Sequence, residues 1–313
     1  MTLQQLEYAV AVAQWGSFVT AADKCFVTQP TLSMQVKKLE EEAGITLFDR
    51  SRQPAALTDA GRIFIDQARV ILREQKRLRE IIASTKGEIA GELRIGIIPT
   101  VAPYLLPLFA DRFTGKYPEV SLVIDELTTE NLITALKEEQ IDCGILATPL
   151  HETQLNEIPL YREPFVAYLS KKSSLWNKRT LKTEDIDPDE VWLLADGHCM
   201  RNQVLQLCGA RKDKSAGLRL NYQSGSLETL RRLVDLGHGM TVLPLLAVAG
   251  LTARQQESLR YFRTPEPVRE ISIVTHRAQL KKALIAKLAE TIQESLPKQL
   301  KRSIRQDVIG ISV

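Results

Sequence analysis

The pattern of apolar runs after Gly87 constrains the fold of this chain more than any other feature. Three runs typical of strands alternate with two stretches typical of helices: Leu93–Ile98, 102–114, Val120–Glu126, 130–139 and Asp142–Ala147. Strands and helices in alternation form a parallel sheet with helices on both faces. The sequence therefore predicts an α/β fold for this part of the chain.

A second set of elements follows the first. Its predicted strands and helices lie near residues 165–169, 191–195, 197–208, 218–222, 226–236 and 240–243, and a strand at 271–275 and a helix at 279–295 close the chain. Two α/β halves joined by crossing segments form a cleft, and ligands of such folds bind at the C-terminal ends of strands. We therefore expect a two-lobed domain over residues 89–300, with a solvated tail over 301–313.

The beginning of the chain indicates short helices packed together. Thr2 and Gln5 fit the capping box of a first helix, which Gly16 ends. Ser17 and Thr28 are suited to cap the second and third helices. The N-terminal region is therefore predicted to be all-helical up to the end of the third helix.

The joint between the second and third helices, Phe26-Val27-Thr28, has the length found in helix-turn-helix motifs. The stretch that follows, Leu47–Leu57, is interrupted by Gln53-Pro54 and suits a short hairpin. A helix-turn-helix followed by a hairpin predicts a winged helix-turn-helix domain over residues 1–58.

Residues 59–88 predict one long helix with an apolar seam. The seam residues are spaced alternately four and three apart, with one polar member: Phe64, Ala68, Ile71, Gln75, Leu78 and Ile82. This heptad spacing is typical of helices that pair. We expect the helix to dimerise the chain, and a helix packed on its own domain is the alternative that the spacing leaves open.

Composition places the chain among ordinary globular proteins, with 44% hydrophobic residues, 25% charged residues and a net charge of +3. So small a charge gives no electrostatic indication of a nucleic-acid partner, and a case for DNA must rest on motif and placement. The chain shows neither an export signal nor an apolar run of about 18 residues. We therefore expect a cytoplasmic protein without a membrane partner, whose four cysteines are reduced.

The third helix has the pattern of a DNA-reading helix. Its apolar residues Leu32, Val36, Leu39 and Ala43 fall on one side and predict the face that packs on the core. The N-terminal residues of such a helix reach base edges in the major groove of double-stranded DNA. The candidate DNA-binding residues are Thr28, Gln29, Pro30, Ser33, Met34 and Lys37, with Arg50 and Arg52 in the wing. An amphipathic surface helix without a partner remains the alternative for this helix alone.

Two cysteines lie at opposite ends of one predicted helix, in the stretch DGHCMRNQVLQLCG that begins at Asp196. Cys199 falls in the first turn, where the helix dipole and free amides favour a thiolate, and His198 and Arg201 are adjacent sources of positive charge. Cys208 falls in the last turn, where the dipole has the opposite effect. This asymmetry predicts that Cys199 attacks an oxidant and Cys208 resolves the product.

The spacing of these cysteines suggests a switch. Nine residues of helix separate two Cα atoms by about 13.5 Å, whereas a disulfide needs them within about 7 Å. Pairing Cys199 with Cys208 would therefore unravel the helix, and a cytosolic thiol reductant would reverse it. Two inert packing cysteines are the alternative. A zinc site that includes His198 lacks an evident fourth ligand, so no metal and no cofactor is expected.

Three segments carry a resemblance to a known family. Residues 17–44, SFVTAADKCFVTQPTLSMQVKKLEEEAG, residues 47–61, LFDRSRQPAALTDAG, and residues 236–244, LGHGMTVLP, resemble LysR-type transcription regulators. The resemblance implies a winged-helix domain, a dimerising linker helix, and a two-lobed effector domain like a periplasmic binding protein. It also implies homotetramers on DNA and RNA polymerase as a further partner. Met34 departs from the family, in which many members carry arginine.

The string around Cys199 and Cys208 resembles the peroxide-sensing members of that family. The resemblance implies that hydrogen peroxide oxidises Cys199, which then pairs with Cys208, while His198 and Arg201 position and activate the thiol. It also implies a peroxide pocket that uses Thr100 and Thr129. Helix capping is the alternative role for both threonines, and Arg269 is a weaker candidate for stabilising the reduced thiolate.

Other functions compete with a peroxide switch. A LysR-type regulator controlled by a small metabolite in the interlobe cleft would make the cysteines incidental. A thiol peroxidase would turn over as an enzyme, and the helix-turn-helix argues against it. A free solute-binding protein would need an export signal. We therefore expect a regulator, and no enzyme, with no catalytic residues.

Overall fold

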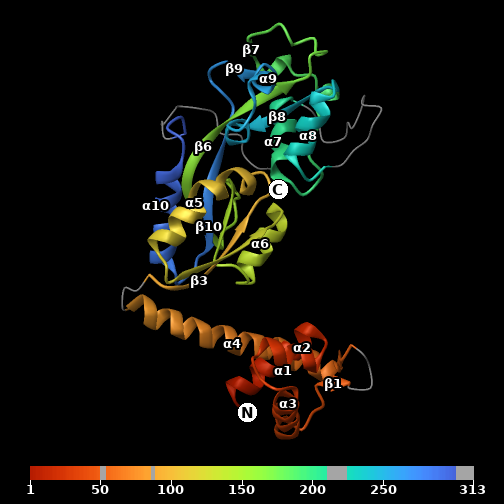
Figure 1. Ribbon diagram of the computed structural model, residues 1–313, viewed down its shortest axis with the longest axis vertical. Helices are drawn as coiled ribbons and strands as arrows, with labels where there is room; N and C mark the ends of the chain where they lie inside the picture. The colour runs from red at the N-terminus through yellow and green to blue at the C-terminus, as the bar shows by residue number, and fades with distance from the viewer. Residues whose placement is uncertain (50–53, 86–88, 210–223, 301–313) are drawn as a thin grey trace. The chain divides into compact units, whose positions relative to one another are not determined.

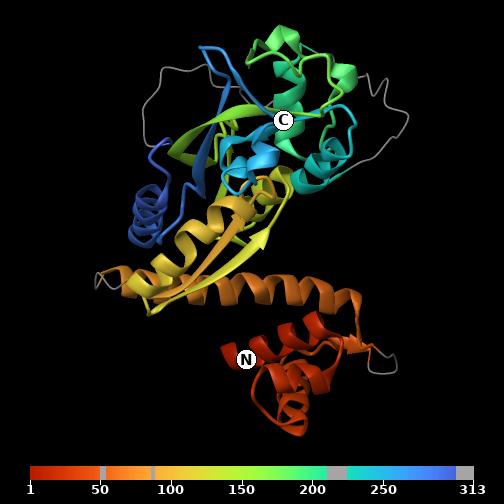
Figure 2. The same ribbon diagram turned by 45° about the horizontal axis from the view of Figure 1, so that its top comes forward.

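The structure is a computed structural model and describes residues 1–49, 54–85, 89–209 and 224–300. The chain forms two compact units, Met1–Gly87 and Glu88–Val313 (Figures 1 and 2). Within the described ranges, no helix has both the length and the apolar character needed to cross a membrane.

The first unit is helical apart from one hairpin. Its elements are α1 (Leu3–Trp15), α2 (Phe18–Lys24), α3 (Gln29–Ala43), β1 (Phe48–Asp49), β2 (Ala56–Leu57) and α4 (Asp59–Thr85). The predicted capping box of Thr2 and Gln5 is present, and Gly16 ends α1 with a φ of 61°. Thr28 precedes α3 without capping a backbone amide; its hydroxyl pairs with that of Thr31 at 2.8 Å. The antiparallel β1–β2 pair forms the wing.

The core of the first unit lies between α1, α2, α3 and the start of α4. Leu32, Val36 and Leu39 of α3 are fully buried, as predicted. Ala43 was expected on the same face but is exposed. It is the last residue of α3, beyond the turn that packs against the core. The turn before α3 places Phe26 at a positive φ of 55° with its side chain 95% exposed.

The long helix α4 changes character along its length. Ile65 and Ala68 near its start are buried in the core of the first unit. Farther along, Ile71, Leu78 and Ile82 are exposed by 37%, 58% and 52%. The beginning of the predicted seam therefore packs on its own domain, whereas its later apolar residues remain uncovered in one chain.

The second unit begins with a parallel α/β lobe, here called lobe I. Its elements are β3 (Gly91–Ile97), α5 (Ala102–Lys116), β4 (Val120–Glu126), α6 (Thr129–Lys137) and β5 (Cys143–Thr148). β3 pairs in parallel with both β4 and β5, so right-handed connections place α5 and α6 on opposite faces of the sheet. The closing helix α10 (Lys282–Ser295) packs beside α5 (Figure 1).

Two long strands run between the lobes. β6 (Leu155–Leu169) and β10 (Val268–His276) pair antiparallel, and β10 also pairs with β5 of lobe I. The prediction for 165–169 found only the end of β6. Pro159 and Pro164 interrupt its sequence before residue 165, and a register shift near Pro159 accommodates the first of them within the ladder.

The second lobe, lobe II, surrounds the far half of β6. Its elements are β7 (Thr180–Leu181), short 3-10 turns at Thr183–Asp185, Pro188–Glu190 and Leu245–Val248, α7 (Cys199–Leu207), α8 (Leu227–Asp235), β8 (Met240–Pro244), α9 (Ala253–Gln256) and β9 (Leu259–Phe262). β8 and β9 each pair with β6.

Two further strands were predicted for lobe II, at 191–195 and at 218–222. The one at 191–195 is wrong, since this stretch forms isolated bridges at Val191 and Leu194. The one at 218–222 lies outside the described residues. The predicted fold class is confirmed: a winged helix-turn-helix, a long helix and a two-lobed α/β domain.

Candidate functional site

The helix α7 begins at Cys199 and ends at Leu207, with His198 and Cys208 as its flanking cap residues. Gly197 and Gly209 lie just outside with φ angles of 87° and 65°, so positive-φ glycines bound both ends. All four cysteines carry free thiols. The sequence placed the two cysteines at the ends of this helix, and the structure agrees to within one residue.

The start of α7 lies at the junction of the two lobes. Cys199 is 5% exposed and belongs to the apolar core of lobe I, whereas the next residue, Met200, belongs to the core of lobe II. A helix whose first two residues enter different cores fixes the position of the Cys199 thiol relative to both lobes. Movement of α7 would therefore disturb the packing of each lobe.

Thr129 and Arg269 are the polar side chains that act on Cys199, and Thr100 is bound to Arg269. All three are nearly inaccessible to solvent. Arg269 donates from Nη1 to the Thr100 hydroxyl at 3.0 Å and from Nη2 to the Thr100 carbonyl at 3.1 Å. The hydroxyl of Thr129 has no hydrogen-bond partner of standard geometry within the described residues. It lies close enough to Cys199 to favour the thiolate. A buried hydroxyl with unused capacity is suited to bind a small polar ligand.

The roles expected for the two threonines as helix caps differ from those observed. Thr128, not Thr129, precedes α6, and Thr129 is its first helical residue. Helix boundaries predicted from sequence commonly shift by one or two residues. Thr100 lies in the turn after β3 and before α5, whose cap position is Val101. The side chain of neither threonine caps a helix in the structure.

The arginine that binds Thr100 is part of a buried ion pair. Arg269 of β10 and Glu163 of β6 are 1% and 0% exposed, with Nη2 and Oε2 2.8 Å apart. The other carboxylate oxygen of Glu163 accepts the Leu246 amide at 2.7 Å. The sequence gave no reason to single out Glu163, because it joins Arg269 only through the register of β6 with β10.

Burial raises the pKa of the Cys199 thiol. The nearby Thr129 side chain, the charge of Arg269 and backbone amides at the start of α7 act in the opposite direction, and burial outweighs them. The helix start lowers this pKa in the predicted direction, but the net shift is upward because burial has the larger effect. The predicted dipole acts, but on a thiol enclosed by two cores.

Arg201 and His198 were predicted to place positive charge beside Cys199, and the structure gives both residues other surroundings. Arg201 pairs with Asp196 at 2.8 Å and donates to the Leu194 carbonyl at 3.0 Å. Burial lowers the pKa of His198, which favours its neutral form. Arg269, rather than these two residues, supplies the charge that favours a Cys199 thiolate.

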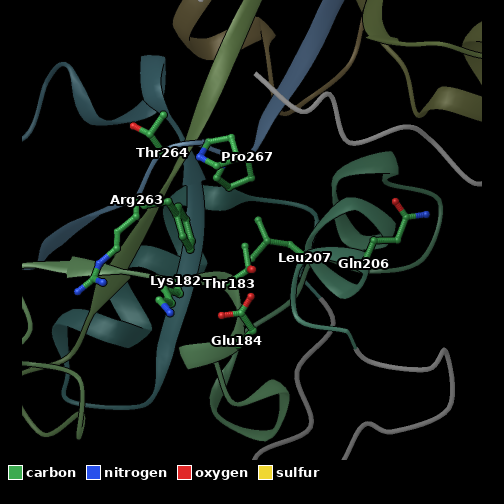
Figure 3. A pocket seen from close by; sticks show the side chains of 10 residues that line it. Lys182, Thr183, Glu184, Gln206, Leu207, Arg263, Thr264 and Pro267 are labelled. Carbon is green, nitrogen blue, oxygen red and sulfur yellow. The ribbon is translucent and has the colours of Figure 1, made fainter. Parts of the chain in front are cut away.

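The other end of α7 has a different environment. Cys208 is half-buried against the core of lobe II, and burial raises its pKa to about 12. An open pocket of about 560 Å³ borders this end of the helix. Figure 3 shows Gln206 and Leu207 of α7 at one wall, with Lys182, Thr183, Glu184 and Arg263 among the residues that line the rest. The last turn of α7 therefore adjoins open space.

The candidate DNA-binding residues lie around the start of α3. Thr28, Gln29, Pro30, Met34 and Lys37 are exposed and Ser33 is half-buried. Lys37 also approaches Glu41 one turn later, at 3.7 Å. Arg50 and Arg52 lie outside the described residues. The structure therefore presents the predicted α3 face to solvent.

Two protein families match the chain. Residues 3–62 match "Bacterial regulatory helix-turn-helix protein, lysR family", and residues 86–297 match "LysR substrate binding domain". The DNA-binding transcriptional dual regulator OxyR of Escherichia coli K12 is 36% identical over 314 residues, covering 98% of this chain and 100% of the relative.

Solved structures of OxyR proteins are similar as well. A full-length OxyR mutant from Pseudomonas aeruginosa superposes with a TM-score of 0.70 at 33% identity, covering 94% of this chain and 98% of that one. A cysteine-to-serine OxyR mutant from Corynebacterium glutamicum with hydrogen peroxide bound has a TM-score of 0.63 at 28% identity, with coverages of 94% and 92%. The similarity therefore spans both units.

Proposed function

Because the chain belongs to the LysR family of bacterial helix-turn-helix regulators, we propose that it is a peroxide-responsive transcription regulator switched by a reversible Cys199–Cys208 disulfide. Curated relatives at 36% identity are named hydrogen peroxide-inducible genes activators. The observation that carries the proposal is the placement of Cys199. Its thiol lies at the lobe junction beside the buried Thr129 hydroxyl and the Arg269 guanidinium, and Arg269 also binds the Thr100 hydroxyl. A second thiol lies at the far end of the same helix.

The first chemical step is oxidation of Cys199 by hydrogen peroxide. The sulfur attacks one peroxide oxygen, an S–O bond forms and the O–O bond breaks, and the thiol proton leaves with the second oxygen as water. The hydroxyls of Thr100 and Thr129 are suited to hold the peroxide. We assign His198 and Arg201 to the same site as positioning residues, on the basis of the resemblance.

The second step joins the two sulfurs. Cys208 attacks the sulfenic acid, an S–S bond forms, and the sulfenic oxygen leaves as a second water. The ends of α7 lie about 13.5 Å apart, whereas the Cα atoms of a disulfide lie within about 7 Å. The helix must therefore unravel, and Cys199 must leave the core of lobe I. A cytosolic thiol reductant restores both thiols by exchange.

We assign DNA binding and dimerisation to the first unit. We assign residues 1–58 to binding of double-stranded DNA, residues 59–88 to dimerisation, residues 89–300 to sensing, and 301–313 to a tail outside the described residues. The exposed Ile71, Leu78 and Ile82 of α4 support a homodimer seam. We also propose a homotetramer on DNA, a cytoplasmic location and contact with RNA polymerase, on the basis of the resemblance to the family.

The test is peptide mapping of reduced protein exposed to one equivalent of peroxide. We expect one disulfide, Cys199–Cys208, while Cys25 and Cys143 stay thiols and serve as internal controls. The DNA footprint is expected to change in the same samples. If both α7 thiols survive in folded protein, the proposal is rejected. A response to a metabolite that persists in Cys199→Ser protein would favour a ligand-controlled regulator instead.

A further inference from the structure

The five N–H groups of Arg269 are not used equally. Nε and Nη2 donate to Oε2 of Glu163 at 2.9 and 2.8 Å, and Nη2 also donates to the Thr100 carbonyl at 3.1 Å. Nη1 donates to the Thr100 hydroxyl at 3.0 Å and faces the Met200 sulfur at 4.0 Å. Four N–H groups therefore bind oxygen at normal lengths, and the fifth points at a thioether, which is a weak acceptor.

This arrangement indicates where a peroxide would receive a hydrogen bond. A peroxide oxygen that displaced Glu163 or Thr100 from Arg269 would break an N–H···O bond to a buried oxygen, at a cost in free energy. The N–H that faces Met200 can instead donate to the peroxide without breaking a hydrogen bond to a buried oxygen. A peroxide bound there would contact the Met200 sulfur, in the residue that directly follows Cys199.

We propose that Met200 is a second site of modification by hydrogen peroxide, oxidised to methionine sulfoxide in the same pocket. The inference rests on the proposed function, because it needs peroxide to reach the Arg269 guanidinium. The thioether sulfur attacks one peroxide oxygen, an S–O bond forms and the O–O bond breaks. The sulfur loses two electrons, and the second oxygen leaves as water with both peroxide protons.

The site can accommodate the product. A sulfoxide oxygen is a stronger hydrogen-bond acceptor than a thioether sulfur, so it can take the fifth N–H of Arg269 at normal length. Met200 is 1% exposed, and this hydrogen bond offsets part of the cost of burying a new polar group.

The modification would alter recovery of the switch. Met200 belongs to the core of lobe II and lies on α7. A polar sulfoxide at this position weakens the packing of α7 against that core. Thiol reductants reverse the disulfide, whereas the sulfoxide needs a dedicated reductase. High peroxide would therefore leave protein whose α7 re-forms less completely after the disulfide is reduced.

The chain contains matched comparison residues. Met240 is 0% exposed and belongs to the same core of lobe II. It lies in β8, where its backbone carbonyl accepts the Trp192 amide. Met34 of α3 is 62% exposed and reports the reactivity of a methionine in solvent. Burial alone predicts equal oxidation of Met200 and Met240.

The experiment uses full-length Cys199→Ser protein, in which α7 cannot be opened by a disulfide. Samples are treated with excess hydrogen peroxide, digested, and assayed by mass spectrometry for one added oxygen on each methionine. We expect Met200 to be oxidised about tenfold or more faster than Met240, equivalent to about 1.4 kcal/mol of activation free energy. Equal rates for the two residues would overturn the inference.

Wild-type and Met200→Leu proteins complete the design. Both are oxidised and then treated with dithiothreitol, and both are expected to form the Cys199–Cys208 disulfide, since leucine retains the apolar volume. After reduction, wild-type protein is expected to recover its reduced DNA footprint only in part, and Met200→Leu fully. Equal recovery contradicts the inference. Absence of the disulfide in wild type contradicts the proposed function instead, so the two failures are distinct.

Discussion

The two ends of α7 show how one helix gives two thiols different chemistry. At Cys199 burial raises the pKa, but a hydroxyl, a guanidinium and backbone amides oppose that effect. At Cys208 burial raises the pKa to about 12, and among the described residues no group opposes that effect. The Cys199 end is enclosed by two cores, whereas the Cys208 end borders an open pocket. The surroundings, more than position on the helix, therefore distinguish the thiol that we propose reacts with peroxide from the thiol that we propose resolves the product.

The largest expected effect comes from comparing two variants, each of which keeps only one of the two α7 thiols. Cys199→Ser should abolish oxidation of the remaining α7 thiol by one equivalent of peroxide, since no described residue stabilises a Cys208 thiolate. Cys208→Ser should still consume peroxide and accumulate a Cys199 sulfenic acid, detectable by a dimedone-type probe. Equal peroxide consumption by both variants would remove the distinction between the two ends.

The pH dependence of alkylation tests the Cys208 end directly. A pKa of about 12 in place of 9.0 makes the thiolate about a thousandfold scarcer near neutral pH than in unfolded protein. Alkylation of Cys208 in native reduced protein should therefore rise about tenfold for each pH unit, with no plateau near pH 9. Peptide mass spectrometry measures this, with denatured protein as the reference.

The same shift has a consequence for stability. The folded protein holds the Cys208 proton more tightly than the unfolded protein does. This contribution to the unfolding free energy is present below the ordinary thiol pKa and is lost as the pH rises toward 12. A Cys208→Ala variant should show a flatter decline of stability with pH in that range, whereas an unchanged decline would mean that Cys208 does not carry the shift.

The buried ion pair between Arg269 and Glu163 provides a further test. Arg269→Met leaves the Glu163 carboxylate buried without its cation, which costs about 3–5 kcal/mol of unfolding free energy. It also removes the charge that favours a Cys199 thiolate, so oxidation by peroxide should slow. Urea unfolding and the rate of sulfenic acid formation measure the two effects.

The chain supplies a control one residue away. Arg162 precedes Glu163 on β6 and pairs with Glu270 at 3.1 Å, but its side chain is 48% exposed. Arg162→Met should change the unfolding free energy by less than about 1 kcal/mol and leave Cys199 oxidation unchanged. A similar loss in both variants would show that the buried pair has no special role.

The smallest expected effect concerns the end of α7. Gly209 has a φ of 65° with open space around its Cα, so Gly209→Ala adds about 1 kcal/mol of backbone strain at the helix end. Pairing of Cys208 with oxidised Cys199 should become about fivefold faster, measured by quenched-flow mass spectrometry. Gly115→Ala within α5 also meets no neighbour and should leave this rate unchanged.

Local sequence patterns predicted most of the fold. The strands of lobe I, the helix-turn-helix and α7 follow from apolar periodicity and from helix-boundary residues such as Thr2 and Gly16. The full length of β6 was missed because Pro159 and Pro164 argue locally against a strand. Pairing with β10 overrides that preference, and such long-range pairing is not encoded in any short window.

The candidate site likewise contains residues that could be predicted from the sequence and residues that could not. Cys199 and Cys208 could be found because both lie on one helix. The role of Glu163 could not, since its partner Arg269 lies far along the chain and meets it through the β6–β10 register. The raised pKa of Cys199 was also beyond prediction, because it depends on insertion of the α7 start into the core of the opposite lobe.

The paired crossing strands have a mechanical consequence. β6 pairs with β10 over residues 155–164, with a register shift near Pro159, and continues over residues 165–169 to pair with β8 in lobe II. Hinge bending between the lobes therefore has to deform a strand that both lobes share. Clam-like closure around a ligand therefore requires bending of β6. The proposed switch needs no such bending, because one covalent bond refolds α7 locally.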